Sequence, residues 1–285
     1  MKKKCGLKIN HVDEFHVVFI GAGGIFSELE VPLAEILRGL LPVEWMNPSA
    51  TVEEKFSKVF TRKIRVTIVD GDRFEPGNEY RQNITSSQYG KFKAEYFARK
   101  LSNKINYDVY FVNRYIYNKN DLINILQKQK NSLPILVGCC DNDAARKVMH
   151  GACNKMDNVI WIDGGCGKYS GQVVCGIRGN NRLLFPLITD LYPTILKSSI
   201  KEQKKTHSLQ NGGTCSRVTT IDSRNFNQTV ISNMYAAVHI ISFLNDILMG
   251  NELTVNSVDF NAQRYLSAPT CIDFNSAKSA SRKTR

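Results

Sequence analysis

Polar residues suited to nucleotide binding are concentrated in one stretch of the chain, between Asp70 and Lys93. A carboxylate can accept hydrogen bonds from ribose hydroxyls or coordinate a metal ion. Arginine offers a planar fork of donors to phosphate oxygens, and lysine supplies a point charge. The candidates in this stretch are Asp70, Asp72, Asn78, Arg81, Gln82 and Lys93. Charged loops are often only solvated, so the elements around the stretch decide how it is interpreted.

A second candidate site follows the first predicted strand. The apolar residues 15–20 lead directly into Gly21, Gly23 and Gly24, and apolar residues at helical spacing come next. A strand, a glycine turn and a helix form the arrangement in which phosphate binds backbone N–H groups at a helix start. Phe26 stands where a third motif glycine is usual. We therefore expect Phe26 either to narrow the nucleotide site or to shift the helix.

The third candidate site is Asp141 with Asn142, just after the apolar strand predicted at 134–139. The stretch at 70–93 likewise begins where a predicted strand, residues 66–69, ends. Ligands of parallel α/β sheets bind at the carboxyl ends of the strands. The three sites should therefore converge on one edge of a sheet.

Strands and helices alternate up to residue 163, which predicts an α/β, Rossmann-like fold. Such a fold has a mostly parallel sheet with helices on both faces. In the C-terminal half, apolar segments predict antiparallel strands that extend the sheet, a long helix at 226–249 and a final strand at 254–261. The expected divisions are an N-terminal segment (1–14), a nucleotide-binding core (15–176), a region completing the same domain (177–261) and a loosely ordered basic tail (262–285).

Composition limits the class of protein. Hydrophobic residues make up 42% of the 285 residues and charged residues 22%, as in soluble globular proteins. The net charge of +12 suits acidic partners or nucleic acid, but no nucleic-acid recognition motif accompanies it. The eight cysteines form no CxxC pair, so no zinc is expected. The apolar segment 235–249 is shorter than the roughly 20 residues that span a bilayer, and no secretory signal is evident. We expect a cytoplasmic protein without a membrane segment.

In four motifs the chain resembles the ThiF/MoeB/ubiquitin-activating adenylyltransferase family. They are DGDRFEPGNEYRQ (70–82), GKFK (90–93), CCDNDAAR (139–146) and GQV (171–173). The likeness is clear over residues 15–174. The later half is similar in outline to small prokaryotic ThiF-like proteins of the PRTRC type.

This resemblance implies ATP- and Mg-dependent adenylation of a carboxylate, often the C-terminal glycine of a ubiquitin-like protein, by a homodimer. It implies that the glycine turn holds phosphate, that Asp70 with Asp72 holds the ribose, and that Asp141 positions Mg. The triphosphate would be bound by Asn78, Arg81 and Lys93. The nucleotide-binding set is completed by Gln82 and Asn142. The implied catalytic residues are Arg81, Lys93, Asp141 and Cys215.

Cys215 follows a Gly-Gly turn, in the region where relatives carry a cysteine that takes an activated acyl group or sulfur. The alternative is an inert cysteine, because many adenylating relatives need none. His207 lies eight residues before it, but no third residue that would orient a Cys/His pair can be named.

Three other functions stay open. The net charge would suit a ThiF-like enzyme that activates a carboxylate on tRNA. A glycine turn with Asp70 would also suit an NAD-dependent oxidoreductase, which leaves Arg81, Lys93 and Asp141 unexplained. A degenerate, non-catalytic scaffold is suggested by Phe26 and by the lack of any arginine before Phe15, where many relatives supply one.

Overall fold

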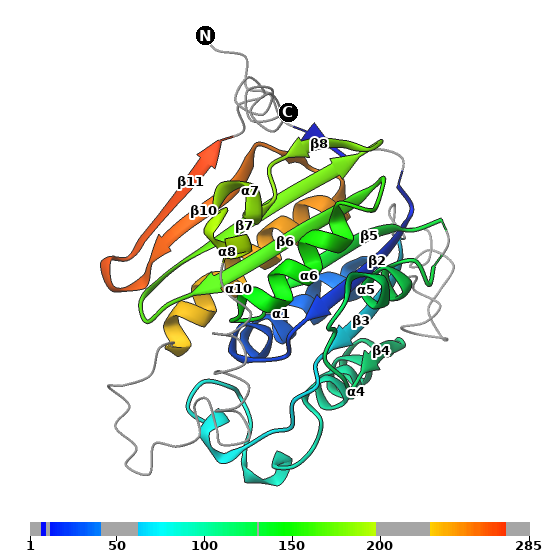
Figure 1. Cartoon of the computed structure of the whole chain (residues 1–285). Helices are drawn as coiled ribbons and strands as arrows, with labels where there is room; N and C mark the ends of the chain where they lie inside the picture. Colours follow the sequence, from blue (N-terminus) through cyan, green and yellow to red (C-terminus); the bar gives the residue numbers. More distant parts are fainter. Residues whose placement is uncertain (1–6, 10–11, 41–61, 130, 198–228, 272–285) are drawn as a thin grey trace.

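The computed structural model describes residues 7–9, 12–40, 62–129, 131–197 and 229–271. A nine-stranded sheet runs through the molecule in the order β11-β10-β7-β6-β5-β2-β3-β4, with β8 paired to β7 (Figure 1). Its strands are β2 (Glu14–Ile20), β3 (Lys63–Val69), β4 (Val109–Val112), β5 (Leu133–Gly138), β6 (Val159–Cys166), β7 (Ser170–Gly179), β8 (Arg182–Phe185), β10 (Val255–Asn261) and β11 (Leu266–Cys271).

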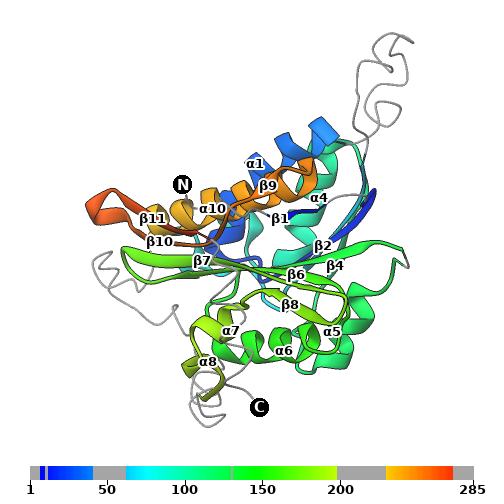
Figure 2. The same ribbon diagram turned by 90° about the horizontal axis from the view of Figure 1, so that it is seen from above.

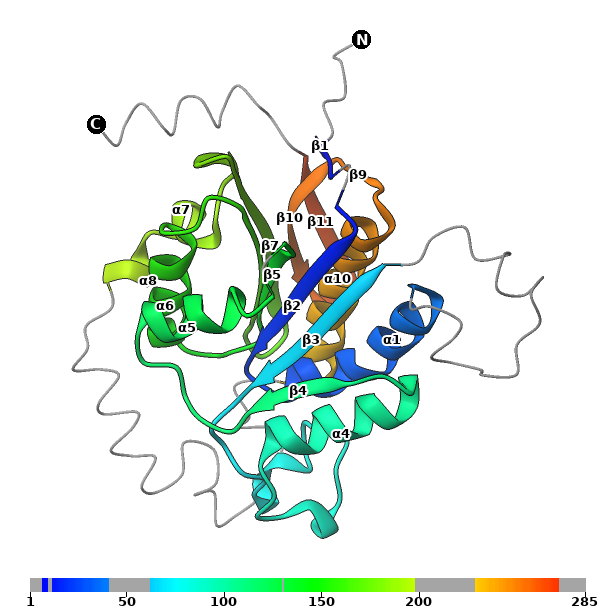
Figure 3. The ribbon, with the colours of Figure 1, turned by 90° about the vertical axis from the view of Figure 1, so that its right-hand side faces the viewer.

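The sheet has a parallel and an antiparallel part. β4, β3, β2, β5 and β6 pair in parallel, and their carboxyl ends therefore meet at one edge of the sheet (Figure 3). β6 pairs antiparallel with β7, which pairs antiparallel with both β8 and β10. The predicted α/β class is confirmed, including the antiparallel extension in the C-terminal half.

Helices cover both faces of the sheet (Figure 2). One face carries α1 (Gly24–Leu40), α4 (Lys93–Ile105) and α10 (Val230–Met249), and the other carries α5 (Lys119–Leu126), α6 (Asp143–Cys153), α7 (Ile188–Leu191) and α8 (Thr194–Lys197). Each face has its own apolar core, because alternate side chains of the strands point to opposite faces.

Phe26 belongs to the core of the first face, and the expectation that it narrows the nucleotide site is wrong. Its side chain is fully buried, and its ring packs edge-to-face on Phe19 at 5.0 Å and on Phe97 at 5.3 Å between centroids. The third residue of an α-helix here points toward the sheet, away from the glycine turn that precedes it. A large side chain at this position therefore serves packing between α1, β2 and α4.

The strand predicted at 254–261 is present as β10, but it is not the last strand. The chain turns after it through a short 3-10 helix (Ala262–Arg264), and β11 pairs antiparallel with β10. Part of the segment expected to be a loosely ordered tail is therefore an edge strand. At the other terminus, β1 (Leu7–Lys8) pairs antiparallel with β9 (Glu252–Leu253).

α10 is longer than the apolar segment predicted in the sequence. It has 20 residues, and by length and composition alone it is apolar enough to cross a membrane. Nearly half of its most apolar window is buried, against α1, β6 and β7. These contacts are those of a core helix, which passes the same composition test.

The fold also contains a buried histidine. His16 on β2 is fully buried, its Nδ1 donates to the Leu126 carbonyl oxygen at 3.1 Å, and its Nε2 lies 2.9 Å from the Thr67 hydroxyl. Burial is the main reason why its pKa falls from 6.5 to about 4.

We predict that this histidine makes the fold acid-sensitive. Because the pKa of His16 is lower in the folded than in the unfolded chain, its contribution is complete above about pH 6.5 and is lost as the pH falls toward about 4. Between about pH 7.5 and about pH 5 the loss should be about 2 kcal/mol in the free energy of unfolding. Urea unfolding at both pH values measures this loss of unfolding free energy. A His16→Gln variant should show a smaller difference between the two, and an unchanged difference would contradict this assignment.

Candidate functional site

A pocket of about 730 Å³ opens where the parallel strands end. The predicted residues that line it are Gly21, Gly23, Gly24, Asp70, Asp72, Arg81, Gln82, Lys93, Asp141 and Asn142. They come from the glycine turn after β2, the long connection between β3 and α4, and the connection between β5 and α6. The predicted convergence of the three candidate sites on one edge of the sheet is therefore present in the structure.

The glycine turn crosses from β2 to α1 between two neighbouring strand ends. The Gly21 N–H donates to the Val69 carbonyl oxygen at 2.9 Å, and Gly21 has a φ of +95°, a conformation that favours glycine. A Cβ at Gly24 would lie 2.2 Å from the Asn233 amide nitrogen on α10, so α10 requires a glycine there. Next to Gly23 there is open space. The N–H groups in the first turn of α1 lack partners within the helix, so this wall of the pocket suits a phosphate group.

Asp70 connects the glycine turn to the β3–α4 connection. Its two carboxylate oxygens accept hydrogen bonds from the backbone N–H of Ala22 at 2.6 Å and from that of Asp72 at 2.7 Å. Burial raises the pKa of Asp70, and the charge of Lys93 opposes that rise. Each carboxylate oxygen has a further lone pair, so a ribose hydroxyl can still donate to Asp70.

Asp72 has partners within the protein. Its Oδ2 lies 3.2 Å from the Lys93 Nζ, and its Oδ1 accepts a hydrogen bond from the Tyr115 hydroxyl. Lys93 is 5% exposed, so its ammonium group is held close to this carboxylate at the pocket wall. The geometry makes Asp72 the counter-ion of Lys93, and the ribose-binding role that the resemblance implied for Asp72 stays a prediction.

Arg81 and Gln82 have polar groups without partners. Within the described ranges the Arg81 guanidinium makes no ion pair, and its buried Nε has no hydrogen-bond partner. Gln82 is 4% exposed, and neither its amide nitrogen nor its amide oxygen has a hydrogen-bond partner among the described residues. The loop that carries them is fixed on α1, because the Asn83 N–H donates to the Ser27 hydroxyl at 2.8 Å. Buried polar groups of this kind normally have partners, so their position at the pocket indicates a polar, anionic ligand.

Asp141 and Asn142 occupy the opposite wall. Asn142 is the N-cap of α6, where its Oδ1 accepts a hydrogen bond from the Ala145 N–H at 2.9 Å. Asp141 is exposed at the pocket. Mg²⁺ is usually bound by one or two carboxylates together with phosphates and water, and Asp141 beside a phosphate-binding wall fits that requirement.

Arg146 of the CCDNDAAR motif has a structural role. Its Nε donates to Asp163 on β6 at 2.8 Å, and its Nη2 donates to the carbonyl oxygens of Cys140 at 2.9 Å and Gly164 at 3.2 Å. Burial raises the pKa of Asp163, and the Arg146 guanidinium opposes that rise. The pair joins the ends of β5 and β6 directly before Asp141, and no sequence motif indicated that Asp163 is the partner of Arg146.

One predicted site residue lies outside the pocket lining, and another lies outside the described residues. Asn78 is buried outside the pocket lining, and its Oδ1 accepts a hydrogen bond from the Glu75 N–H at 3.1 Å in a 3-10 turn (Pro76–Asn78). Cys215 lies outside the described residues, as does His207. Sequence reasoning also missed residues that line the pocket from the β4–α5 connection and from α6. They are Arg114, Tyr115, Ile116, Tyr117 and Lys147.

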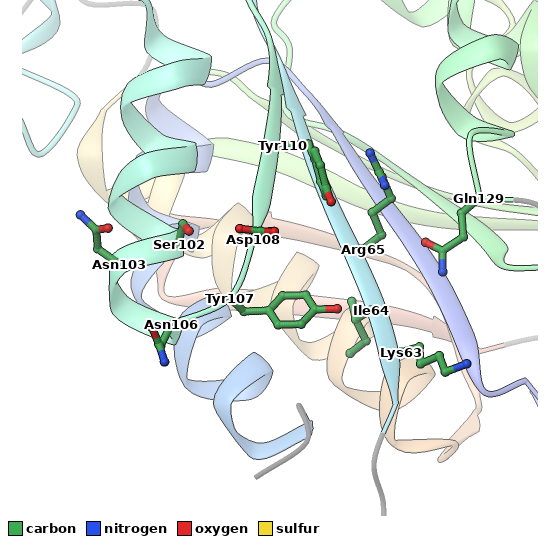
Figure 4. A pocket seen from close by; sticks show the side chains of 10 residues that line it. All are labelled: Lys63, Ile64, Arg65, Ser102, Asn103, Asn106, Tyr107, Asp108, Tyr110 and Gln129. Atoms are coloured by element: carbon green, nitrogen blue, oxygen red, sulfur yellow. The ribbon is translucent and has the colours of Figure 1, made fainter. Parts of the chain in front are cut away.

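A second cavity, of about 950 Å³, lies around the amino-terminal half of β3 (Figure 4). Here the Arg65 guanidinium stacks on the Tyr110 ring at 3.5 Å from the centroid, and Lys63 pairs with Glu14 at 2.8 Å. The cavity contains neither the glycine turn nor the acidic strand ends. The candidate site is therefore the pocket at the carboxyl edge.

We predict that Gly23→Ala weakens nucleotide binding without unfolding the protein. A Cβ at Gly23 meets no atom within 4 Å, so the fold should tolerate it, but the methyl group would occupy space that a phosphate needs. We expect a loss of roughly tenfold in affinity for Mg·ATP, the equivalent of about one hydrogen bond to a charged group. Calorimetric titration measures the affinity, and thermal melting provides the control. Unchanged affinity would show that phosphate does not bind at this turn.

We predict that Arg146→Met destabilises the fold by about 3–5 kcal/mol, because it leaves the Asp163 carboxylate buried without its counter-charge. Urea unfolding at neutral pH measures the change. Arg99→Met is the matched control, since the Arg99–Glu95 pair is largely exposed and should contribute little. Similar unfolding midpoints for the two variants would contradict the role of the buried pair.

Comparison with known proteins identifies the family and the fold of the chain. The ThiF family model matches residues 62–271. No curated protein matches the sequence significantly. Similar solved structures include E. coli MccB with AMPCPP and MccA (TM-score 0.55, 15% identity, 90% of this chain and 63% of MccB covered). PaaA is similar too (TM-score 0.56, 16% identity, 91% of this chain and 73% of PaaA covered). E. coli MccB with ATP is also similar (TM-score 0.53, 15% identity, 90% of this chain and 63% of MccB covered).

These likenesses concern the fold, because all the identities are low. The chain corresponds to about 63% of the length of MccB. The family match covers most of the chain and contains the Asp70–Lys93 stretch, Asp141 and the antiparallel extension. The chain belongs to the ThiF family, and its fold is that of ThiF-like adenylating enzymes.

Proposed function

We propose that the protein catalyses ATP- and Mg-dependent adenylation of a carboxylate. The observation that carries the proposal is the Arg81 guanidinium, which makes no ion pair in the described part of the chain and lines the same pocket as Lys93, the glycine turn and Asp141. A nucleoside triphosphate matches these groups, because it brings negative charge to the cations and phosphate oxygens to the first turn of α1.

In this reaction a carboxylate oxygen of the substrate attacks the α-phosphorus of ATP. The new bond is P–O, the bond between the α-phosphorus and the bridging oxygen breaks, and pyrophosphate leaves with its electron pair. Arg81 and Lys93 neutralise the charge that develops on pyrophosphate, and Asp70 orients the ribose. Mg²⁺ held by Asp141 would add a further positive charge at the phosphates. Catalysis of this type depends on orientation and preorganised charge, with no protein nucleophile in the adenylation step.

The substrate we propose is the C-terminal carboxylate of a small peptide or protein, of ubiquitin-like type. Support comes from the family membership and from the similarity to MccB, which was solved with MccA. Transfer of the activated group to Cys215 and assembly as a homodimer belong to the same proposal. In the described part of the chain Cys139, Cys140, Cys153 and Cys175 are free thiols, which suits the reducing cytoplasm as the proposed location.

The alternatives predict different ligands. An oxidoreductase would bind NAD in competition with ATP, a tRNA-directed enzyme would bind tRNA with strong salt dependence, and a scaffold would bind no nucleotide. The Arg81 guanidinium, which makes no ion pair with any described residue, favours a triphosphate over NAD. Displacement of a fluorescent ATP analogue by Mg·ATP, NAD and tRNA distinguishes the four cases.

We predict that Arg81→Ala and Lys93→Ala each lower ATP–pyrophosphate exchange by about 10²–10³-fold, because each removes a preorganised positive charge. Exchange is measured with the small-protein fraction of the source cells as the carboxylate donor, and mass spectrometry detects AMP-linked products. Arg73→Ala is the matched control. Arg73 lies in the same connection, but its guanidinium stacks on Phe92 and does not line the pocket.

Wild-type protein that binds Mg·ATP and yet yields no exchange and no adenylate with any fraction would contradict adenylation. Near-normal exchange in both alanine variants would contradict the assigned roles of Arg81 and Lys93. The control variant should keep the wild-type rate.

A further inference from the structure

Tyr115, which no sequence motif singled out, contacts the carboxylate that pairs with Lys93. The Tyr115 hydroxyl donates to Oδ1 of Asp72, while the Lys93 ammonium lies 3.2 Å from Oδ2 of the same carboxylate. The two contacts use different oxygens of one group. Asp72 therefore links the start of α4, where Lys93 lies, to the β4–α5 connection, which carries Tyr115.

The backbone is shaped to accept the Tyr115 ring at this position. A Cβ at Gly71 would lie 2.7 Å from the Tyr115 Cδ2 atom, so the ring packs directly on the glycine beside Asp72. The pKa of Tyr115 is raised, mainly by burial and next by the hydrogen bond to Asp72. Its hydroxyl is therefore protonated and able to donate.

Lys93 depends on such a contact because of its chemistry. A lysine side chain is long and flexible, and its ammonium group has no fixed direction of its own, unlike a guanidinium. A carboxylate held by one partner can turn about its χ angles, whereas a carboxylate held at both oxygens has a fixed orientation. The Tyr115–Asp72 hydrogen bond thus limits where the ammonium group of Lys93 can lie.

We propose that Tyr115 is a positioning residue that acts through Asp72 to place the ammonium group of Lys93 against the outer phosphates of a bound nucleoside triphosphate. This inference rests on the proposed function of the pocket. It assigns Asp72 to the lysine and leaves the ribose to Asp70. It also gives the β4–α5 connection, which lines the pocket with Arg114 and Tyr117 as well, a part in phosphate binding.

The test compares two nucleotides that differ in the outer phosphates. Calorimetric titration gives the affinities of the full chain for Mg·AMPPNP, a non-hydrolysable ATP analogue, and for AMP. In the wild type, Lys93 and Arg81 should make AMPPNP bind more tightly than AMP. Tyr115→Phe keeps the ring and removes the hydroxyl, and it should reduce the AMPPNP-to-AMP affinity ratio by roughly tenfold while AMP binding stays nearly constant. A tyrosine needed only for packing would change both affinities alike and leave the ratio intact.

Two further variants make the test specific. Lys93→Ala should reduce the ratio at least as far as Tyr115→Phe does, and adding Tyr115→Phe to Lys93→Ala should reduce it no further, because the lysine through which the tyrosine acts is gone. Tyr110→Phe is the matched control. Tyr110 lies on β4 at the second cavity, outside the candidate site, and its loss of a hydroxyl should leave the ratio unchanged.

The outcomes separate this inference from the proposed function. If the wild type prefers AMPPNP and Tyr115→Phe keeps that preference, the positioning role of Tyr115 is overturned and the nucleotide site remains. If the effects of Tyr115→Phe and Lys93→Ala are additive, Tyr115 does not act through Lys93, and the inference is again overturned. If the wild type binds neither nucleotide, the proposed function fails and the inference fails with it.

Discussion

The carboxylate of Asp70 joins the two loops on which the pocket depends. One oxygen accepts the Ala22 N–H from the glycine turn, and the other accepts the Asp72 N–H from the β3–α4 connection. A buried carboxylate is costly to desolvate, and here two N–H donors and the nearby Lys93 charge offset that cost. Because both loops bind the same side chain, the glycine turn and the β3–α4 connection, which carries Arg81 and leads into Lys93, have a fixed relative position.

Other buried charges fix the scaffold around these loops. Glu30 on α1 is fully buried, and the ammonium groups of Lys100 and Lys104 on α4 lie within 3.1 Å of it. The Arg146–Asp163 pair holds the ends of β5 and β6 together in the same way. A pair of this kind tolerates little movement, because separating the partners leaves a charge in a medium that solvates it poorly. The pocket is thus surrounded by elements that are held at defined distances, which suits chemistry that relies on orientation.

Much of the fold and the site could be predicted from the sequence because the relevant signals are local. Strand–glycine–helix patterns are short, and residues at the carboxyl ends of parallel strands share one edge, so Gly21, Asp70 and Asp141 could be brought together without a structure. What was missed depends on contacts between distant residues. Asp163 and Arg146 are each unremarkable in their own segments, and Tyr115 reaches Asp72 across 43 positions. The expectation that Phe26 narrows the site failed because the motif gives spacing along the chain and does not give the direction of a side chain on the helix.

The contact between Gly24 and Asn233 has a consequence for biosynthesis. Gly24 lies in the first turn of α1, whereas Asn233 belongs to α10, a helix that packs along α1 and is translated only after the whole parallel part of the sheet. While the ribosome is still synthesising the chain, α1 has no α10 to cover it, and the wall behind the glycine turn is incomplete. A nascent chain therefore cannot complete the packing behind the glycine turn until α10 has been synthesised.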